Sequence, residues 1–319
     1  MSTHRAAGAL TLAGLVLLAA GCAGADDGDG AGARLEVLAS VYPLQYAVQQ
    51  VGGDLVSVTT ATPAGTDPHS VELSPRQLRD VGDADLVVLL GGFQPAVDEA
   101  AAERATTVLD VAGAADLHPL PAGPADGHED EDEGHDDESH EDEGHEHAGG
   151  LDPHFWLDPT RLAAVGEVIA DALAAADPAH ADTYAANAEA FAAELDQLDD
   201  AFTDGLTGCA NDVVVTSHAA FGYLTDRYGL RQVSVSGLDP EGEPSPARIR
   251  EVRDAIAELE VGAVFTEPLA DPAVAETLAE GLGVQVLSLD PLDSHDGDDD
   301  YGAVMDQNLE ALRTGLGCP

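Results

Sequence analysis

The sequence predicts an α/β protein made of two doubly wound parallel-sheet lobes that are joined by one long rigid helix. Its 319 residues are enough for two domains, and 44% of them are hydrophobic, as in globular proteins. Short apolar runs alternate with helix-like segments in both halves of the chain, which is the pattern of βαβ units. Between the halves, residues 178–206 carry one apolar stripe at helical spacing.

The N-terminal lobe is predicted over residues 34–177. The apolar or alternating runs that we expect to be strands are 34–40, 55–60 and 85–90. Between the last two, Ser74 caps a predicted helix over 74–81 that has Pro75 at its first position. A strand, a helix and a further apolar strand in this order predict a parallel sheet that is covered by helices.

The C-terminal lobe is predicted over residues 207–319 and repeats the same order. Its expected strands are 212–217, 233–235, 262–266 and 284–289, and its clearest helix is 245–260. The linker helix 178–206 is about 40 Å long at 1.5 Å per residue, which suits a rigid connection between two lobes.

Residues 123–149 interrupt the first lobe with a different composition. Between residues 126 and 147 the chain has thirteen Asp or Glu and five histidines, and none of its aliphatic residues is larger than Ala. Such a segment cannot bury a core, so we expect a disordered insert. Its histidines, which predict low-affinity metal binding, are His128, His135, His140, His145 and His147.

The N-terminus has the features of an export signal. Arg5 precedes an apolar run over residues 6–20, which is too short to span a bilayer as a stable helix. Small residues then lead to Cys22, a pattern that resembles a bacterial lipoprotein signal. We therefore expect a signal peptide over 1–21, a lipid on Cys22 and a flexible tether over 22–33. The protein would be exported and anchored to the outer face of the cell membrane.

Two cysteines remain in the exported part of the chain, Cys209 and Cys318. An even number of cysteines in an oxidising compartment favours a disulfide, which would fix the C-terminus to the second lobe. Two free thiols are the alternative.

The charge balance excludes whole classes of partner. Sixty-one acidic residues oppose twelve basic ones, for a formal net charge of −49. This charge repels nucleic acid phosphates and anionic lipid head groups, so a nucleic-acid binder is excluded. Cations are the ligands that such a surface tolerates best.

Three histidines stand at strand ends or in turns next to proline. His69 follows the second expected strand, His218 follows the strand 212–217, and His154 lies in a Pro-flanked turn. Because ligands of parallel sheets bind beyond the carboxyl ends of the strands, we expect His69 and His218 to point toward a cleft. Asp290 and Glu267 also follow strands and are two candidates for a carboxylate there.

Three imidazoles and one carboxylate suit a borderline metal ion with four ligands. Imidazole nitrogen favours Zn²⁺, whereas Mn²⁺ sites contain more oxygen. Of the other histidines, we expect His118 and His180 on the surface. His295 lies in an acidic loop, where it is exposed or acts as an alternate ligand.

The motifs resemble those of the solute-binding lipoproteins of bacterial zinc/manganese ABC importers. The most specific is Asp152-Pro153-His154-Phe155-Trp156-Leu157-Asp158-Pro159. The others are Gly65-Thr66-Asp67-Pro68-His69, His218-Ala219-Ala220-Phe221-Gly222-Tyr223, Phe265-Thr266-Glu267-Pro268 and Leu289-Asp290-Pro291-Leu292. They span the chain from about residue 37 to 312.

The resemblance implies a zinc site in the cleft between the lobes, formed by His69, His154, His218 and Asp290, with Glu267 as an alternative ligand or a supporting residue. It also implies a monomer that captures Zn²⁺ and delivers it to the permease and ATPase of an ABC importer, without catalysis. The alternatives are a manganese or iron carrier of the same class and a metal-binding surface adhesin. An exported zinc hydrolase is the last alternative, although the sequence has no His-Glu-x-x-His helix.

Overall fold

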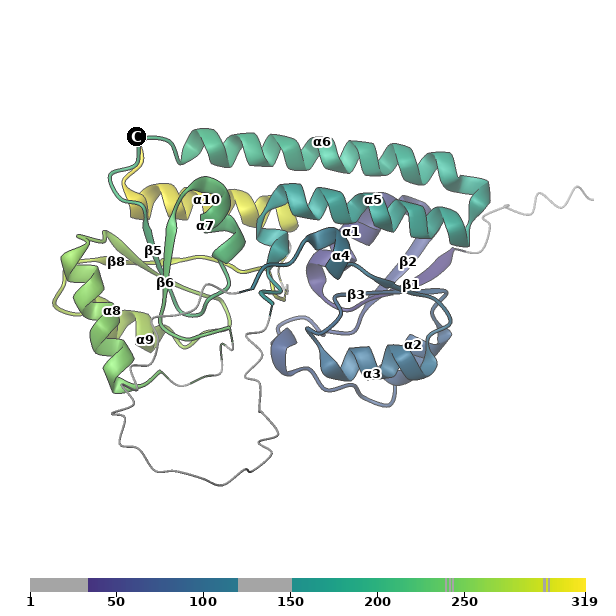
Figure 1. Ribbon diagram of the computed structural model, residues 1–319, viewed down its shortest axis with the longest axis horizontal. Helices are drawn as coiled ribbons and strands as arrows, with labels where there is room; N and C mark the ends of the chain where they lie inside the picture. Colours follow the sequence, from purple (N-terminus) through teal and green to yellow (C-terminus); the bar gives the residue numbers. More distant parts are fainter. Residues whose placement is uncertain are drawn as a thin grey trace, which may run out of the picture. The chain divides into compact units, whose positions relative to one another are not determined.

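The computed structural model describes residues 34–119, 151–238, 240, 242, 244–294, 297 and 299–319. The predicted signal peptide, Cys22, the tether, the His-rich insert and His295 lie outside these residues. Within residues 34–319 the chain forms two parallel-sheet α/β lobes (Figure 1), as predicted.

The first lobe has a four-stranded sheet in the order β2-β1-β3-β4. Its elements are β1 (Leu35–Ala39), α1 (Tyr42–Gly52), β2 (Val56–Thr60), α2 (Gln77–Asp83), β3 (Leu86–Leu89), α3 (Pro95–Arg104), β4 (Val108–Asp110) and α4 (Ala112–Ala115). All strand pairs are parallel, and Ala39 pairs with both Thr60 and Val88. The carboxyl ends of β1, β2 and β3 therefore lie at one edge of the sheet.

The second lobe repeats this topology in the order β6-β5-β7-β8. Its elements are β5 (Val213–Thr216), α7 (Gly222–Tyr228), β6 (Arg231–Ser234), α8 (Pro246–Glu258), β7 (Ala263–Thr266), α9 (Pro272–Ala279), β8 (Gln285–Ser288) and α10 (Tyr301–Leu316). Its strands are also parallel, and Thr216 pairs with Phe265.

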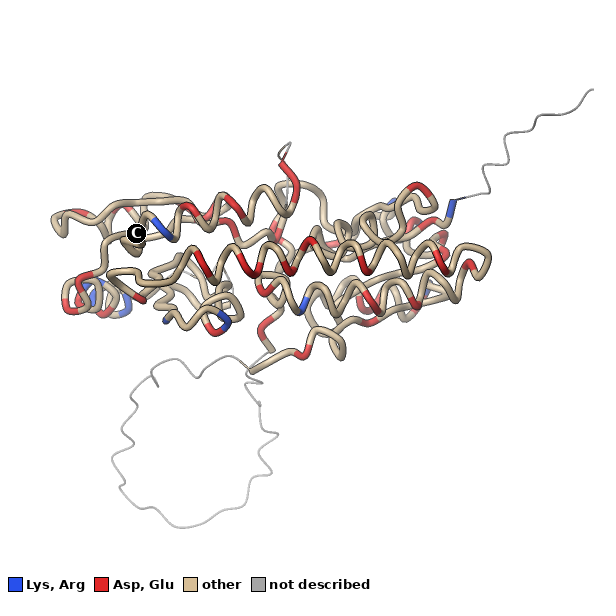
Figure 2. The backbone as a smooth tube through the Cα atoms, turned by 90° about the horizontal axis from the view of Figure 1, so that it is seen from above, with Lys and Arg blue, Asp and Glu red and all other residues tan. Residues whose placement is uncertain are grey.

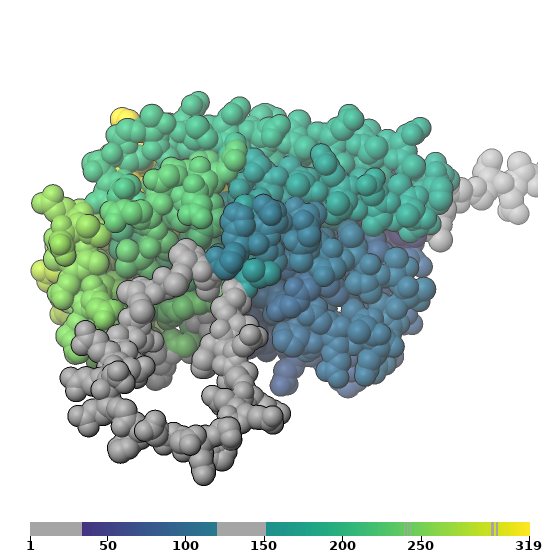
Figure 3. All heavy atoms as spheres, in the orientation of Figure 1, coloured from purple at the N-terminus to yellow at the C-terminus, as the bar shows by residue number. Residues whose placement is uncertain are grey.

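One long helix connects the lobes, as predicted, and a second long helix precedes it and packs on the first lobe. α5 (Pro159–Ala176) begins at the Asp158 cap, and a short 3₁₀ turn at 178–180 leads into α6 (Ala181–Gly205). The 25 residues of α6 pack against α5 along one part and against α10 along another (Figure 1). Figure 3 shows the atoms of α5 and α6 as a continuous layer that covers both lobes.

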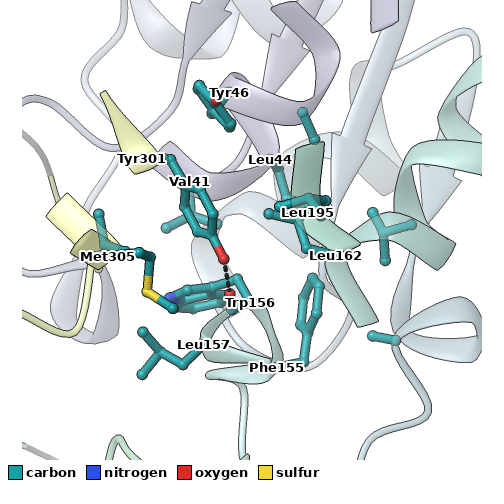
Figure 4. Close-up of a cluster of buried hydrophobic side chains, with 14 of the residues drawn as sticks. Val41, Leu44, Tyr46, Phe155, Trp156, Leu157, Leu162, Leu195, Tyr301 and Met305 are labelled. Atoms are coloured by element: carbon teal, nitrogen blue, oxygen red, sulfur yellow. Dashed lines mark hydrogen bonds between the residues drawn. The ribbon is translucent and has the colours of Figure 1, made fainter. Parts of the chain in front are cut away.

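Both sheets are buried on their two faces, as expected for parallel sheets. In β1, Val37 and Ala39 belong to one buried cluster, whereas Leu38 lies in another on the opposite face. The first cluster continues into the second lobe and includes Phe265 and Met305. Figure 4 shows its centre, where side chains from both lobes pack around Trp156. One hydrophobic core therefore crosses the lobe boundary.

A disulfide joins Cys209 to Cys318, as predicted. Next to it, the backbone N–H of Ala210 donates to the carbonyl of Leu316, 3.0 Å away. The two contacts fasten the end of α10 to the chain that follows α6. Within the described residues, no helix is both long enough and apolar enough to cross a membrane.

Acidic residues are distributed along the whole described chain, whereas arginines are sparse (Figure 2). The cation-tolerant surface that the composition predicts is therefore not confined to the His-rich insert.

Candidate metal centre

Four side chains from separate parts of the chain converge between the lobes: His69, His154, His218 and Asp293. One ligand atom from each lies within 4.8 Å of the ligand atoms of the others. His69 follows β2, His218 follows β5 and Asp293 follows β8, so parallel strands point all three toward the site. His154 comes from the segment that leads into α5. The structure thus brings together the three histidines that the sequence singled out.

The distances between the ligand atoms approach those of a tetrahedral site. The Nε2 atoms of His154 and His69 are 3.3 Å apart. Asp293 places carboxylate oxygens 3.5 Å from His154 Nε2 and 3.7 Å from His218 Nε2. Zinc with bonds of about 2.0–2.1 Å to nitrogen would hold its tetrahedral ligands about 3.3 Å apart. A small contraction around the ion is enough to complete the geometry.

His154 is oriented by Asp152. The ring Nδ1 of His154 lies 2.7 Å from Asp152 Oδ1, and the same oxygen accepts the backbone N–H of His154 at 3.0 Å. The His154 side chain is fully buried. Because the carboxylate holds a proton on Nδ1, the lone pair of the ring is on Nε2, which points at the other ligand atoms.

His218 repeats this arrangement with Glu267. Its ring Nδ1 is hydrogen-bonded to Glu267 Oε2, and its backbone N–H donates to Glu267 Oε1 over 3.0 Å. Only 1% of the His218 side chain is exposed. Glu267, which the sequence suggested as an alternative ligand, thus supports a histidine from behind. It is not a member of the four-residue cluster.

His69 is held mainly through its backbone. Asp67 Oδ1 accepts the backbone N–H of His69 at 2.9 Å, and Gln94 donates to the carbonyl of Pro68 at 3.1 Å. The ring packs edge-on against Phe93, with 4.9 Å between the ring centroids. The side chain keeps an exposed fraction of 13%, so His69 is the most accessible of the three imidazoles.

The carboxylate of the cluster is Asp293 and not Asp290, which corrects the expectation from the sequence. Asp290 Oδ1 instead accepts the backbone N–H of Leu292 at 2.8 Å. Leu292 has a left-handed backbone, with φ of 59°, which costs a residue other than glycine about 1–2 kcal/mol. This turn carries the chain past Asp290 and presents the carboxylate three residues later to the imidazoles.

Burial and charge set the protonation of the metal-free site. Burial, together with repulsion from His154 and His218, lowers the pKa of His69 to about 3. Burial raises the pKa of Asp293 to about 6, although nearby imidazoles oppose this shift. Burial also opposes the charged form of His154, but the carboxylates around it, led by Asp293 and Asp152, outweigh burial and raise its pKa.

Two buried atoms of the cluster lack a hydrogen-bond partner among the described residues: His218 Nε2 and Asp293 Oδ1. Buried polar atoms without partners are rare and unfavourable, so a ligand for both atoms is indicated. A cation that accepts imidazole and carboxylate donors satisfies them together. The donor set of three nitrogens and one carboxylate fits Zn²⁺.

The remaining candidates lie away from the cluster. His118 is exposed and its ring lies 3.1 Å from a guanidinium nitrogen of Arg161. The ring of His180 is hydrogen-bonded to the carboxylate of Asp177 on the surface. Both are surface residues, as expected. Sequence reasoning missed Asp293 as a ligand candidate and Asp152 as a supporting group, although Asp152 stands in the most specific motif.

A cavity of about 630 Å³ adjoins the site from the second lobe. His218, Glu267 and Asp293 contribute to its wall, and Leu269 lies farther along its lining. The cavity offers a path by which an ion can reach ligand atoms that are otherwise buried.

Comparisons with known proteins find relatives that are described as zinc-binding or zinc-uptake proteins. The family described as zinc-uptake complex component A, periplasmic, matches residues 37–315. The zinc-binding lipoprotein AdcA of Streptococcus pneumoniae strain R6 is 34% identical over 312 residues, which cover 95% of this chain and 59% of AdcA. The chain therefore spans about three fifths of that relative. The high-affinity zinc uptake system protein ZnuA of Bacillus subtilis is 30% identical over 321 residues, 97% of each chain.

Solved structures show the same fold. The Zn(II)-bound ZnuA-like domain of S. pneumoniae AdcA is 31% identical, with a TM-score of 0.70 over 89% of this chain and 99% of the domain. The laminin-binding protein Lmb of Streptococcus agalactiae, described as bifunctional with adhesin and metal transporting activity, is 29% identical. Its TM-score is 0.73 over 88% of this chain and 99% of Lmb. The chain belongs to the family of zinc-uptake complex component A proteins.

Proposed function

We propose that this protein captures Zn²⁺ outside the cytoplasm and delivers it to an ABC importer. The observation that carries the proposal is the convergence of three Nε2 atoms and one carboxylate on a single buried point, with His154 and His218 each backed by a carboxylate. The ligands are His69, His154, His218 and Asp293.

Four protein ligands favour carriage over catalysis. A hydrolytic zinc site keeps a position open for the water that it activates, whereas a closed tetrahedral site holds the ion without that chemistry. Imidazole nitrogen dominates the donor set, which favours Zn²⁺ over Mn²⁺. The convergent metal ligands support this function more directly than the adhesin activity described for Lmb.

A competition titration tests the proposal. Residues 34–319 and the same chain without residues 123–149 are titrated with Zn²⁺ and Mn²⁺ against a chromophoric chelator. We expect one tight zinc site in both proteins, which survives excess Mn²⁺ and is lost in His218→Ala. The matched control is His180→Ala, a surface histidine that should leave the affinity unchanged. A deleted chain without a tight site would place the metal in the insert and refute the cleft.

The same titration tests the insert. We propose that His128, His135, His140, His145 and His147 collect zinc weakly near the cleft. The undeleted chain should then bind additional zinc with low affinity, and the deletion should remove only this part of the isotherm. Equal stoichiometry in the two proteins would contradict a metal role for the insert.

We propose further that Cys22 carries a lipid that holds the protein at the outer face of the membrane, where a permease and an ATPase complete the importer. Cys22→Ala should move the protein from the membrane fraction to the soluble exported fraction. Retention of the variant on the membrane would contradict the anchor. A permease that co-purifies with the wild type but not with Cys22→Ala would identify the importer.

A further inference from the structure

We propose that Asp290 and Asn308 are positioning residues that hold the turn from which Asp293 reaches the metal. This inference rests on the proposed zinc capture and assigns a role to two side chains outside the ligand set. It also gives Asp290 a function that differs from the one expected from the sequence.

The turn needs to be held because its backbone is strained. Three described residues other than glycine have a positive φ: Asp116, Glu260 and Leu292. The first two are exposed, whereas Leu292 is fully buried. Left-handed backbone is unfavourable for leucine, so it persists only where the surroundings impose it. The carboxylate of Asp290, which accepts the Leu292 N–H, is the nearest such constraint.

Asn308 on α10 fixes Asp290 in turn. Its side-chain amide accepts the backbone N–H of Asp290 at 2.8 Å and donates to the Asp290 carbonyl at 2.7 Å. The Asn308 side chain is almost fully buried, with 2% exposed. The following residue, Pro291, accepts a hydrogen bond from the indole N–H of Trp156 at 2.8 Å. Trp156 lies two residues after His154 and is central in Figure 4.

The Asp293 side chain has no comparable support of its own. Its oxygens lie 3.5–3.9 Å from the three imidazole nitrogens, too far for hydrogen bonds, and Oδ1 has no partner among the described residues. Before the ion arrives, the direction of this carboxylate therefore depends on the backbone that carries it. After Asp293 in the chain, Ser294 accepts the Gly65 N–H at 2.7 Å. Before Asp293, Asp290 and Asn308 hold the turn.

The test compares Asp290→Ala and Asp290→Asn in residues 34–319, each in the wild-type and the Asp293→Asn background. Zinc affinity is measured by chelator competition, and the visible absorption of bound Co²⁺ reports the coordination. We expect Asp290→Ala to lower zinc affinity about 10–100-fold, as for other groups that orient a metal ligand, and to change the Co²⁺ spectrum in the direction of Asp293→Asn.

Asp290→Asn should bind zinc nearly as well as the wild type, because an amide oxygen accepts the same N–H. In the Asp293→Asn background, Asp290→Ala should have no further effect, since its target is already absent. The matched control is Asp110→Ala in the first lobe, which removes a hydrogen bond of the same spacing: Asp110 Oδ1 accepts the Ala112 N–H at 3.0 Å. It should lower the melting temperature without changing zinc affinity.

Three outcomes would overturn the inference. Asp290→Asn could lose as much affinity as Asp293→Asn, which would make Asp290 a ligand. Asp290→Ala could weaken zinc equally in both backgrounds, which would uncouple it from Asp293, or it could have no effect. A wild-type chain that fails to bind zinc would instead refute the proposed function itself. If Asp290→Ala does not fold, Asp290→Asn alone still separates a ligand from a positioning residue.

Discussion

The two most deeply buried histidines of the site, His154 and His218, are built in the same way. In each, one carboxylate accepts both the backbone N–H and the ring Nδ1–H of the histidine. Two bonds from one carboxylate fix the tautomer and the ring orientation together. The partners come from different places, since Asp152 is two residues away in the chain and Glu267 follows a neighbouring strand.

Glu267→Gln and Asp152→Asn should each weaken zinc binding about 10–100-fold, because the ring would lose a charged acceptor that makes Nε2 a better donor to the metal. Affinity is measured by chelator competition on residues 34–319. Glu251→Gln on the exposed face of α8 is the matched control and should have no effect. Unchanged affinity in both site variants would show that the carboxylates only stabilise the fold.

Zinc binding should release protons, and its affinity should fall in acid. His154 has a raised pKa and Asp293 a pKa of about 6, so protons on these groups compete with the ion, whereas His69, with a pKa near 3, stays neutral. Affinity therefore rises with pH. The dependence should be steepest below pH 6, where a proton on Asp293 competes with the ion in addition to the proton on His154.

Calorimetry in buffers of different ionisation enthalpy measures this release on the chain without residues 123–149, so that the insert does not contribute. Asp293→Asn should reduce the slope below pH 6, where Asp293 itself titrates, and should also reduce it above pH 6, because the charge that most raises the pKa of His154 is lost. Zinc binding at pH 5 without net proton release would contradict protonated His154 and Asp293 in the metal-free site.

At the scale of elements, α10 carries Asn308 toward the site and packs against the sheet of the second lobe. Gly315 allows this close approach: a Cβ there would lie 2.6 Å from Phe265 Cζ and 3.0 Å from Ala263 Cβ. Gly315→Ala should therefore lower the free energy of unfolding by about 1–3 kcal/mol, because the clash outweighs the higher helix propensity of alanine.

Chemical denaturation measures this effect. Gly302→Ala is the matched control in the same helix, since its nearest atom would be an Asp300 oxygen at 3.5 Å, an ordinary contact. That variant should be neutral or slightly stabilising. Equal stability of the Gly315 variant and the wild type would show that α10 can shift away from β7 without loss.

Most strands could be predicted because they are buried runs with strong apolar character, such as β3 and β5. The exceptions have weaker signals. β4 is a three-residue edge strand with mostly exposed side chains, and β6 starts two residues before its predicted position, at polar Arg231. α5 was not predicted, although Asp158 and Pro159 mark its beginning. The apolar stripe that was predicted belongs to the longer helix α6.

The fourth ligand could not be predicted for a different reason. Asp290 follows the end of β8 and was therefore the expected ligand. The left-handed backbone of Leu292 instead brings Asp293 into the cluster. No local pattern predicts that conformation for leucine, since it is imposed by Asn308 from α10 and Trp156 from the other lobe. The three histidines were predictable because His218 directly follows the end of β5, and His69 and His154 stand in turns next to proline.

At the scale of the whole molecule, one hydrophobic cluster extends through both lobes, and α6 packs against helices of each. The hydrogen bond from Trp156 to Pro291 and that from Tyr301 to the Trp156 carbonyl, 2.6 Å, join the lobes beside the metal site (Figure 4). These contacts restrict a wide opening of the cleft. Metal binding should then shift loops and produce a small tilt rather than a large hinge motion.

The disulfide acts on the stability of the whole chain and not on the site. It joins Cys209 and Cys318, which are 109 positions apart, just after the C-terminal end of α10. Asn308 lies in the middle of that helix, and the Asp293 turn precedes its N-terminal end. Replacing both cysteines by serine should lower the free energy of unfolding by up to about 4–5 kcal/mol, the loss that the chain-entropy model gives for a loop of this length.

Zinc affinity of this double variant, measured well below its melting temperature, should equal that of the wild type, because every ligand and its supporting carboxylate remain in place. Reduced wild-type protein is the matched control and should reproduce the loss of stability without a mutation. A variant that is folded by circular dichroism but binds zinc weakly would contradict this expectation. It would show that the disulfide affects the site through α10, and that the second lobe supports Asp293 less independently than its contacts indicate.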